Sequence, residues 1–484
     1  MADAQRMVVI GGNATGMAAA SHARRLRTPD ELEIVVLERG DFTSYSSCGI
    51  PYWVAGDVGR AEDLVVRTPE EHRRRGLEVR MRTEATALDV GRRRVRLRPS
   101  GADADPSGEA WLDYDHLVLA TGARPVRPSL PGVDAAGVHG VQTLDEGRAL
   151  LHALEADEAE EAEGPQGGRA GHASGRRREA VVIGAGYIGV EMSEALVRRG
   201  YAVTVLDQAE QPMNTLDPDM GALVREAMDG MGITTVTGAD VTALRASADG
   251  RVTHVVTGDG TAYPADVVVL GLGVRPETAL ARAAGLPVGD SGGLLTDLTQ
   301  RVRGHRDIWA GGDCVEVLDL VAGRTRHIAL GTHANKHGQV IGANVGGDYA
   351  TFPGVVGTAV SKVCDLEIAR TGLLERQASD LGLRYVTVTV ESTSRAGYFP
   401  GAAPMHVKML AEHRTGRLLG VQIVGREGAG KRVDVAAVAL TAGLTVEQMT
   451  ALDLGYAPPF SPVWDPVLVA ARKATTAVRR AVRG

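Results

Sequence analysis

Cysteine and lysine are scarce in this chain of 484 residues. Its three cysteines, Cys48, Cys314 and Cys364, lie far apart, which excludes a disulfide framework and a Cys-x-x-Cys pair but allows one reactive thiol. Five lysines stand beside 48 arginines, and the net charge of -7 argues against a nucleic-acid surface, which usually carries a basic excess. No run reaches the roughly 18 apolar residues of a membrane span, and no charged-then-apolar leader precedes the first predicted strand. We therefore expect a cytoplasmic protein with no nucleic-acid or membrane partner.

Glycine is abundant, with 61 residues, and its positions reveal an internal repeat. The same strand, glycine turn, helix, strand and acidic residue occur twice, 173 positions apart. The first unit runs from a strand at 7–10 to Glu38, and the second runs from a strand at 181–183 to Asp207. In such a unit the turn lets the backbone approach a pyrophosphate at a helix N-terminus, and the acid accepts hydrogen bonds from a ribose. The repeat therefore predicts two dinucleotide sites.

The two glycine turns differ at one position. The second fits Gly-x-Gly-x-x-Gly, and Asp207 lies 18 residues beyond its last glycine, Gly189. The first carries Asn13 where the middle glycine should stand, although Glu38 lies 22 residues past Gly16. Glycines that serve only tight turns are the alternative interpretation, which two complete units in order disfavour.

Two further segments complete a dinucleotide site, and two others define the domains. A buried-type strand breaks into a Gly-Pro turn within 117–125, and a strand at 308–310 ends in Gly-Gly-Asp, whose aspartate can accept hydrogen bonds from a polyol. Residues 155–178 contain almost no large apolar side chains, so we interpret them as a solvated insertion, with a binding tail as the alternative. Beyond residue 345 the sequence predicts a third, α+β domain, with strands at 385–390 and 405–410 and a helix at 433–442.

These features resemble the two-dinucleotide flavoproteins of the pyridine nucleotide-disulfide oxidoreductase family, over nearly the whole chain. The resemblance implies an α/β fold with an FAD domain at 1–125 and 290–348, an NADH domain at 126–289 and a C-terminal α+β dimerisation domain at 349–484. It implies FAD contacts at Gly11, Gly12, Asn13, Ala14, Gly16, Glu38, Arg39, Ser47, Ala120, Thr121, Gly122, Gly312 and Asp313. It implies nicotinamide nucleotide contacts at Gly184, Gly186, Tyr187, Ile188, Gly189, Glu191, Asp207 and Gly273.

The second unit also indicates which coenzyme is used. The carboxylate of Asp207 repels a 2'-phosphate, and residues 208–210 offer no arginine to accept one, so we expect NADH rather than NADPH. Tyr187 and Glu191 match a gating tyrosine and a nicotinamide-side acid of the family, with ordinary helix packing as the alternative for both.

The segment around Cys48 resembles the active-site segment of the single-cysteine branch, particularly coenzyme A disulfide reductase. It reads Ser-Tyr-Ser-Ser-Cys-Gly-Ile-Pro-Tyr over residues 44–52. A lone cysteine can work if the substrate supplies the second sulfur, because its thiolate attacks the substrate disulfide and is released when reduced flavin supplies electrons. A helix N-terminus could stabilise that thiolate. The alternative is a small buried hydrophobic residue, which is the interpretation we favour for Cys314 and Cys364.

Two tyrosines match residues that the family delivers from one subunit into the other's active site. They are Tyr456, in a proline-rich segment at 453–466, and Tyr398, in a segment at 395–401. A phenol can donate a hydrogen bond to a departing thiolate and protonate it. Aromatic anchors in the interface of a homodimer are the alternative for both.

Coenzyme A recognition rests on a few polar residues. Ser44 and Ser47 occupy the positions of a serine and an asparagine that precede the cysteine in the reductases. Basic residues on the first helix, His22, Arg24 and Arg25, could meet the coenzyme's phosphates, and a solvated basic face is equally compatible. His333 and His337 have i, i+4 spacing but no third ligand in view, so we expect no metal.

The sequence thus predicts an FAD-dependent, NADH-using enzyme that reduces coenzyme A disulfide or a related small disulfide or persulfide through Cys48. An NADH oxidase or quinone reductase is one alternative, disfavoured because Ala14 stands where family oxidases and peroxidases carry a histidine. A coenzyme A persulfide or polysulfide reductase is a second alternative. A flavin-bound redox sensor without turnover is a third.

Overall fold

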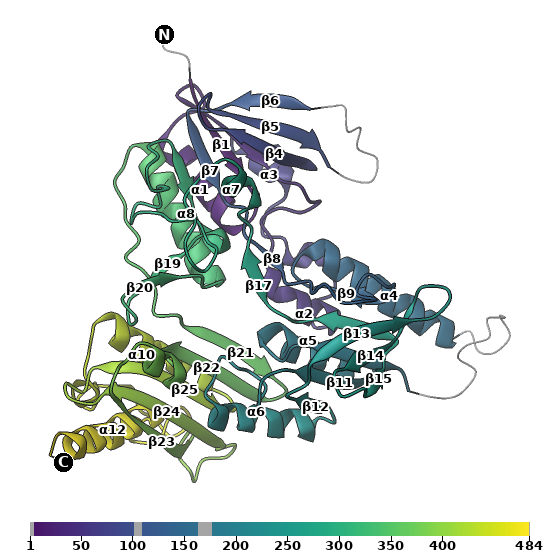
Figure 1. Ribbon diagram of the computed structural model, residues 1–484. Coiled ribbons are helices and arrows are strands. Elements are labelled where there is room, and N and C mark those ends of the chain that lie inside the picture. The colour runs from purple at the N-terminus through teal and green to yellow at the C-terminus, as the bar shows by residue number, and fades with distance from the viewer. Residues whose placement is uncertain (1–3, 101–108, 163–176, 484) are drawn as a thin grey trace.

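The computed structural model describes residues 4–100, 109–162 and 177–483. Figure 1 shows the first glycine-turn unit at the top, the second at the lower right and a third sheet at the lower left. The expected insertion at 155–178 is described only in part, because residues 163–176 lie outside these ranges. Helix α4 (Leu144–Ala162) covers its beginning.

The first unit is a five-stranded parallel sheet. Its strand order is β18 (Ile308–Ala310), β7 (His116–Leu119), β1 (Gln5–Ile10), β2 (Leu32–Leu37) and β3 (Glu78–Arg80). Its strands are almost continuously apolar and buried, as expected for a parallel sheet covered on both faces. Helix α1 (Ala14–Leu26) connects β1 to β2, and α8 (Gly331–Gly346) packs alongside α1 (Figure 1). A Cβ on Gly338 would lie 2.4 Å from the Thr15 carbonyl oxygen, so the two helices need glycine to approach this closely.

The second unit repeats this architecture. Its strand order is β12 (Thr234–Thr237), β11 (Ala202–Asp207), β10 (Glu179–Ile183), β16 (Val267–Leu270) and β9 (Val138–His139), with α5 (Tyr187–Arg198) joining β10 to β11. Strands β8 (Ala123–Pro125) and β17 (Val274–Pro276) pair antiparallel and connect the two units. Each unit also carries a three-stranded antiparallel sheet. In the first unit it consists of β4 (Thr83–Asp89), β5 (Arg94–Pro99) and β6 (Ala110–Asp113). In the second unit it consists of β13 (Val241–Ala246), β14 (Val252–Thr257) and β15 (Ala262–Pro264).

The third sheet is antiparallel. Its order is β21 (Ala359–Val363), β22 (Leu366–Gly372), β25 (Leu418–Gly425), β24 (Pro404–Glu412) and β23 (Tyr385–Thr393). Helices α10 (Ala429–Thr441) and α12 (Pro466–Arg483) pack on one face, and α6 (Pro218–Gly230) of the second unit contacts the sheet as well. Adjacent residues of β25 point to opposite faces, so Ile423 packs with α10 and α12, whereas Val424 joins the core of the second unit. The third sheet is therefore fixed against the second unit.

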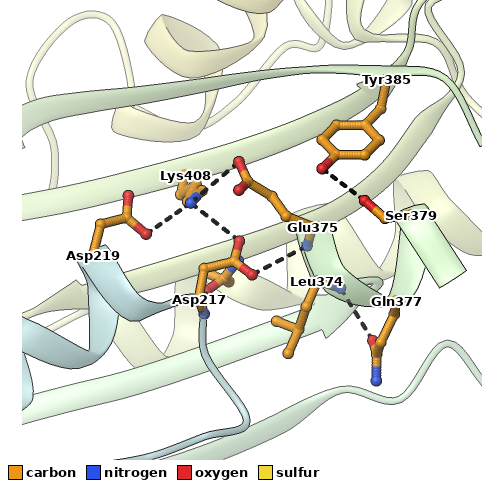
Figure 2. Close-up of polar contacts among 9 residues, drawn as sticks. Asp217, Asp219, Leu374, Glu375, Gln377, Ser379, Tyr385 and Lys408 are labelled. Carbon is orange, nitrogen blue, oxygen red and sulfur yellow. Dashed lines mark hydrogen bonds and ion pairs between the residues drawn. The ribbon is translucent and has the colours of Figure 1, made fainter. Parts of the chain in front are cut away.

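An ion network also crosses this contact (Figure 2). The Lys408 side chain on β24 is 5% exposed, and its Nζ lies 3.1 Å from Asp217, 2.7 Å from Asp219 and 3.4 Å from Glu375. Gln422 Nε2 donates a further hydrogen bond of 2.7 Å to Asp217. Burial alone lowers the pKa of Lys408, but the hydrogen bonds and charges of the two aspartates outweigh it and raise that pKa.

The remaining elements are short. They are α2 (Ile50–Val54), α3 (Pro69–Arg74), α7 (Ala279–Ala283), β19 (Val317–Asp319), β20 (Arg324–Arg326), α9 (Glu375–Asp380) and α11 (Val446–Met449). Within the described ranges, no helix has the length and apolar character that crossing a membrane requires.

Candidate active site

A cavity of about 2120 Å³ is lined by both glycine turns and by the loop that carries Cys48. Most residues that were expected to hold FAD line this cavity. They are Gly11, Asn13, Ala14, Glu38, Arg39, Ser47, Ala120, Thr121, Gly122, Gly312 and Asp313. From the second unit, the expected nucleotide contacts that line it are Gly184, Gly186, Tyr187, Ile188, Glu191, Asp207 and Gly273. Gly12, Gly16 and Gly189 are outside this lining. The fold therefore brings most of the predicted cofactor residues to one cavity.

The glycine turns have the geometry of a nucleotide cradle. Gly11 and Gly184 have φ of +107° and +99°, in the left-handed region that favours glycine. A Cβ on Gly16 would lie 1.9 Å from the Gly11 carbonyl oxygen, and a Cβ on Gly189 would lie 1.9 Å from that of Gly184. The last glycine of each turn therefore lets the helix start directly against the turn, which aims its first N–H groups at the cavity.

The acidic residue at the end of the second strand of each unit is held by its own glycine turn. Glu38 accepts a hydrogen bond of 2.8 Å from the Gly12 N–H, and Asp207 accepts one from the Ala185 N–H. Asp207 also accepts a hydrogen bond of 2.7 Å from the Ala209 N–H. Both carboxylates line the cavity at the position where a ribose diol binds in such units.

Asn13, the departure from the glycine pattern, supports the cysteine loop. Its Oδ1 accepts a hydrogen bond of 3.2 Å from the Tyr45 N–H. The carbonyl oxygen of Gly12 accepts two more hydrogen bonds from this loop, one from the Ser44 N–H at 3.2 Å and one from the Thr43 hydroxyl. The first glycine turn thus positions the loop that leads to Cys48.

Cys48 lies in a single 3-10 turn (Ser47–Gly49) and is exposed on the cavity wall. A Cβ on Gly49 would lie 2.2 Å from a Leu64 methyl carbon, so glycine allows this turn to pack closely. Burial by the surrounding walls raises the pKa of the Cys48 thiol, and the carboxylates of Glu191 and Asp313 raise it further. The expected stabilisation of a thiolate by a helix N-terminus is therefore outweighed in this arrangement.

The other two cysteines are placed differently. Cys314 is completely buried in the core of the first unit, and its thiol contacts the Leu119 and Gly311 carbonyl oxygens. Cys364 is partly buried between β21 and β22 and contacts Met231. Neither residue lines the cavity, so Cys48 alone of the three does.

Two carboxyl groups on the cavity have pKa values near neutrality. Burial raises the pKa of Glu191 to about 7, and burial raises that of Asp313 to about 6. The Ser361 hydroxyl, on β21 of the third sheet, donates a hydrogen bond of 2.7 Å to Glu191. Glu191 therefore titrates near neutral pH, and the C-terminal part of the chain helps to set its pKa.

Among the expected coenzyme A contacts, Ser44, Ser47 and Arg25 line the cavity. His22 lies beside Arg25, with Nδ1 3.0 Å from the guanidinium, and is outside the lining. Arg24 is also outside it, since its guanidinium donates hydrogen bonds to the carbonyl oxygens of residues 27, 32 and 76.

The structure also adds His72, which the sequence patterns did not single out. This histidine on α3 is 1% exposed, and its Nε2 lies 2.9 Å from the Ser44 hydroxyl oxygen. A single histidine on a short charged helix carries no periodic or motif signal, so only the three-dimensional contact reveals it.

Tyr398 and Tyr456 are next to each other but away from the cavity of their own chain. They are 78% and 47% exposed, and their phenols share a hydrogen bond. Neither lines the cavity. Within one chain, the tyrosines and Cys48 are thus not brought together.

The histidine pair at 333 and 337 is part of the first unit's core. Both side chains are buried, with ring centroids 5.1 Å apart, and burial lowers the pKa of His333 to about 4 and that of His337 to about 3. His337 Nδ1 accepts a hydrogen bond of 3.1 Å from the Gly312 N–H, so it supports the turn that carries Asp313. In the ranges that the structure describes, no cluster of three or more His, Cys, Asp or Glu side chains could hold a metal ion.

Family models match this chain over almost its whole length. The model of pyridine nucleotide-disulphide oxidoreductase matches residues 5–338, and that of the family's dimerisation domain matches residues 358–466. The chain belongs to this family. Together with the two nucleotide units described above, membership confirms the predicted fold class and an NAD(P)H-dependent flavoprotein oxidoreductase that uses FAD.

The chain is similar to proteins named as a sulfur oxidoreductase, a persulfide reductase and an NADH oxidase. A CoA-dependent NAD(P)H sulfur oxidoreductase of Pyrococcus abyssi is 34% identical over 471 residues, which cover 96% of this chain and 97% of that protein. An NADH oxidase of Methanocaldococcus jannaschii is 33% identical over 472 residues, 97% of this chain and 98% of that protein. The solved structure of an NAD-dependent persulfide reductase from A. fulgidus superposes with a TM-score of 0.90 at 36% identity, covering 99% of this chain and 84% of that one.

Proposed function

We propose that this protein uses NADH to reduce coenzyme A disulfide, or a related small disulfide or persulfide, through Cys48. The observation that carries the proposal is the position of Cys48, which alone among the three cysteines lies on the wall of the cavity that both nucleotide units line. The sulfur oxidoreductase and persulfide reductase among the similar proteins support the same substrate class.

The cavity of the first unit fits FAD. The Gly11–Gly16 contact has no room for a Cβ, Glu38 stands where a ribose diol binds, and Asp313 offers a carboxylate to the ribityl chain. We assign 1–125 and 290–348 to the FAD domain, 126–289 to the NADH domain and 349–484 to the dimerisation domain. When bound, FAD accepts a hydride from the nicotinamide and passes an electron pair to sulfur.

Cys48 performs the sulfur chemistry as a thiolate. Attack on a disulfide breaks the substrate S–S bond, forms a mixed disulfide with Cys48 and releases one substrate thiolate. Attack on the outer sulfur of a persulfide transfers that sulfur to Cys48 and releases the parent thiolate. Glu191, with a pKa of about 7, carries a charge that opposes thiolate formation at Cys48, so the thiolate forms more readily when Glu191 is protonated.

In this proposal, a tyrosine of the second subunit protonates the departing thiolate. Tyr398 and Tyr456 are exposed within the segment from 358 to 466 that matches the dimerisation domain. A phenol exposed there can enter the partner's cavity and donate a proton to sulfur.

The test is anaerobic. Holoenzyme is reduced with one equivalent of NADH and mixed with coenzyme A disulfide or coenzyme A persulfide, and thiol release and the intact mass of the protein are followed. We expect turnover in the wild type and in Cys364→Ser, and no turnover in Cys48→Ser. A Cys48→Ser variant that keeps full disulfide reductase activity would show the proposal to be wrong.

An NADH oxidase is the second candidate, because one similar protein carries that name. Ala14 lines the cavity where oxidases of the family have a histidine, which argues against efficient reduction of oxygen. An oxygen-electrode trace with NADH alone separates the two functions, since a disulfide reductase consumes NADH slowly without an added disulfide.

A further inference from the structure

Ser44 has a backbone conformation that a residue with a side chain seldom adopts. Its φ is +52°, in the left-handed region. Hydrogen bonds on both sides fix it there: the Ser44 N–H donates to the Gly12 carbonyl at 3.2 Å, and the Val66 N–H donates to the Ser44 carbonyl at 2.8 Å. The side chain lines the same cavity as Cys48. The strained backbone at Ser44 is thus held by hydrogen bonds on both sides, and its side chain lies on the cavity wall.

His72 lies beside Ser44 and lines the same cavity, although it is almost completely buried. Its Nε2 is 2.9 Å from the Ser44 hydroxyl oxygen, and its Nδ1 has no hydrogen-bond partner among the described residues. Burial lowers the pKa of His72, and the charges of Arg67 and Arg75 lower it further, so the ring is neutral at neutral pH and carries one proton.

The position of that proton decides what Ser44 can do. If it were on Nδ1, a buried N–H would lack an acceptor, and the Ser44 O–H would be used up in donating to Nε2. With the proton on Nε2, the N–H donates to the Ser44 oxygen, and only a lone pair of Nδ1 is left unpaired. Orphaned buried N–H groups are rarer in proteins than under-used acceptors, which favours the second tautomer.

We propose that His72 is a positioning residue that donates its Nε2–H to Ser44 and so leaves the Ser44 O–H free to donate into the cavity, to an acceptor on the arm of the sulfur substrate. This inference rests on the proposed function and narrows its substrate class. The compound should combine a hydrogen-bond acceptor near the attacked sulfur with anionic groups, because Arg25 lines the same cavity. A thiol with an amide-containing arm and phosphate groups, such as coenzyme A, meets both requirements.

The test compares two amides that reach different distances. In a glutamine the side-chain amide can occupy the place of Nε2, whereas in an asparagine it reaches only the place of Nδ1. The variants His72→Gln, His72→Asn and His72→Phe are made in the Cys48→Ser holoenzyme, so that binding is measured without reaction. Calorimetry then gives the affinity for coenzyme A and for adenosine 3',5'-bisphosphate, which has phosphates but no thiol arm.

We expect His72→Phe and His72→Asn to weaken coenzyme A binding about tenfold, as for the loss of one hydrogen bond, and His72→Gln to stay within about threefold of the parent. Ser44→Ala should weaken binding as much as His72→Phe, and the double variant should lose no more than either single one. Binding of the bisphosphate should not change in any of them.

Each remaining result overturns the inference. Equal affinities in all histidine variants, additive losses in the double variant, or a parallel loss for the bisphosphate would show that His72 does not act through Ser44. Failure of the proposed function is recognised separately, because then the parent protein does not bind coenzyme A or Cys48→Ser remains an active disulfide reductase. Thermal unfolding of each holoenzyme identifies variants that have lost the fold. If His72→Phe does not fold, the comparison of His72→Gln with His72→Asn still tests the inference.

Discussion

Lys408 and Asp217 form an ion pair of 3.1 Å between the third sheet and the second nucleotide unit, with the lysine 5% and the aspartate 3% exposed (Figure 2). Asp217 precedes α6 and lies two residues after Thr215, which lines the cavity together with Asn214 and Tyr187. The third sheet therefore holds in place one wall of the nucleotide site, in addition to its role in pairing subunits.

Lys408→Met should destabilise the protein and weaken NADH binding. Removing the cation leaves Asp217 buried without its partner, which costs about 3 kcal/mol for buried pairs of this kind. We expect a lower urea midpoint and a higher KM for NADH, with Lys408→Arg close to wild type. Lys431→Met is the matched control, since Lys431 forms an exposed pair with Asp434. Equal effects of the two methionine variants would contradict this account.

Two glycines of the second turn should respond differently to alanine. In Gly189→Ala the new Cβ would meet the Gly184 carbonyl at 1.9 Å, so the unfolding midpoint should fall. At Gly186 no described atom lies within 4 Å of an added Cβ, so the fold of Gly186→Ala should be unchanged. Because Gly186 lines the cavity, we expect its alanine variant to raise the KM for NADH instead. Urea unfolding and steady-state kinetics of both variants check this.

Glu191→Gln should make Cys48 more acidic. The Glu191 carboxylate raises the pKa of the Cys48 thiol, so removing its charge should lower that pKa and shift the pH profile of Cys48 alkylation by iodoacetamide to lower pH. The rate increase should be largest above pH 7, where most Glu191 is ionised, since its pKa is about 7. Glu194→Gln, on the same helix, is the control and should shift the profile less, because Glu194 influences Cys48 only through its effect on the pKa of Glu191. A shift to higher pH in Glu191→Gln would be the opposite of what the charges require.

Mixed dimers can show whether the tyrosine acts across the interface. Cys48→Ser and Tyr456→Phe subunits with different tags are purified as a heterodimer and assayed with coenzyme A disulfide. If Tyr456 serves the partner's Cys48, the heterodimer should have about half of the wild-type activity, because one of its two sites contains both residues. If Tyr456 served its own chain, both sites would lack one residue and the heterodimer would be as inactive as its parents.

Coenzyme choice should follow Asp207. In the double variant Asp207→Ala, Gln208→Arg, the carboxylate that repels a 2'-phosphate is removed, and a guanidinium that can bind this phosphate is added. We expect kcat/KM to fall for NADH and rise for NADPH. The single variant Gln208→Arg is the control, and an unchanged ratio of the two kcat/KM values in the double variant would exclude Asp207 as the determinant.

The two nucleotide units could be predicted because their signals are local: buried apolar strands, glycines in fixed order and an acid at the strand end. Boundaries were less exact, since β1 begins at Gln5 rather than at residue 7. The start of the interpreted insertion is helical, because α4 continues to Ala162. An alternating or apolar pattern predicts a strand but does not indicate which distant strand pairs with it. The strand order of the third sheet was therefore not predicted.

In the candidate site, too, residues with a local sequence signal could be predicted, and residues that act through distant contacts could not. Cys48 and Asp207 both line the cavity; Asp207 was singled out by its spacing from a glycine turn, and Cys48 by the resemblance of its segment to the single-cysteine branch. His72 and Ser361 were missed, because each acts on a partner that is distant in the sequence, Ser44 and Glu191 respectively. Contacts of this kind arise from how loops and sheets pack, and one sequence contains no signal for them.

The Ser361–Glu191 hydrogen bond lowers the proton affinity of an acid on the cavity wall, against the larger opposite effect of burial, from a strand of the dimerisation domain. A substitution in that domain can therefore change the pKa of Glu191, and through it that of Cys48, without changing any residue on the cavity wall. Related enzymes with identical pockets can in this way acquire different pH optima through changes at their periphery.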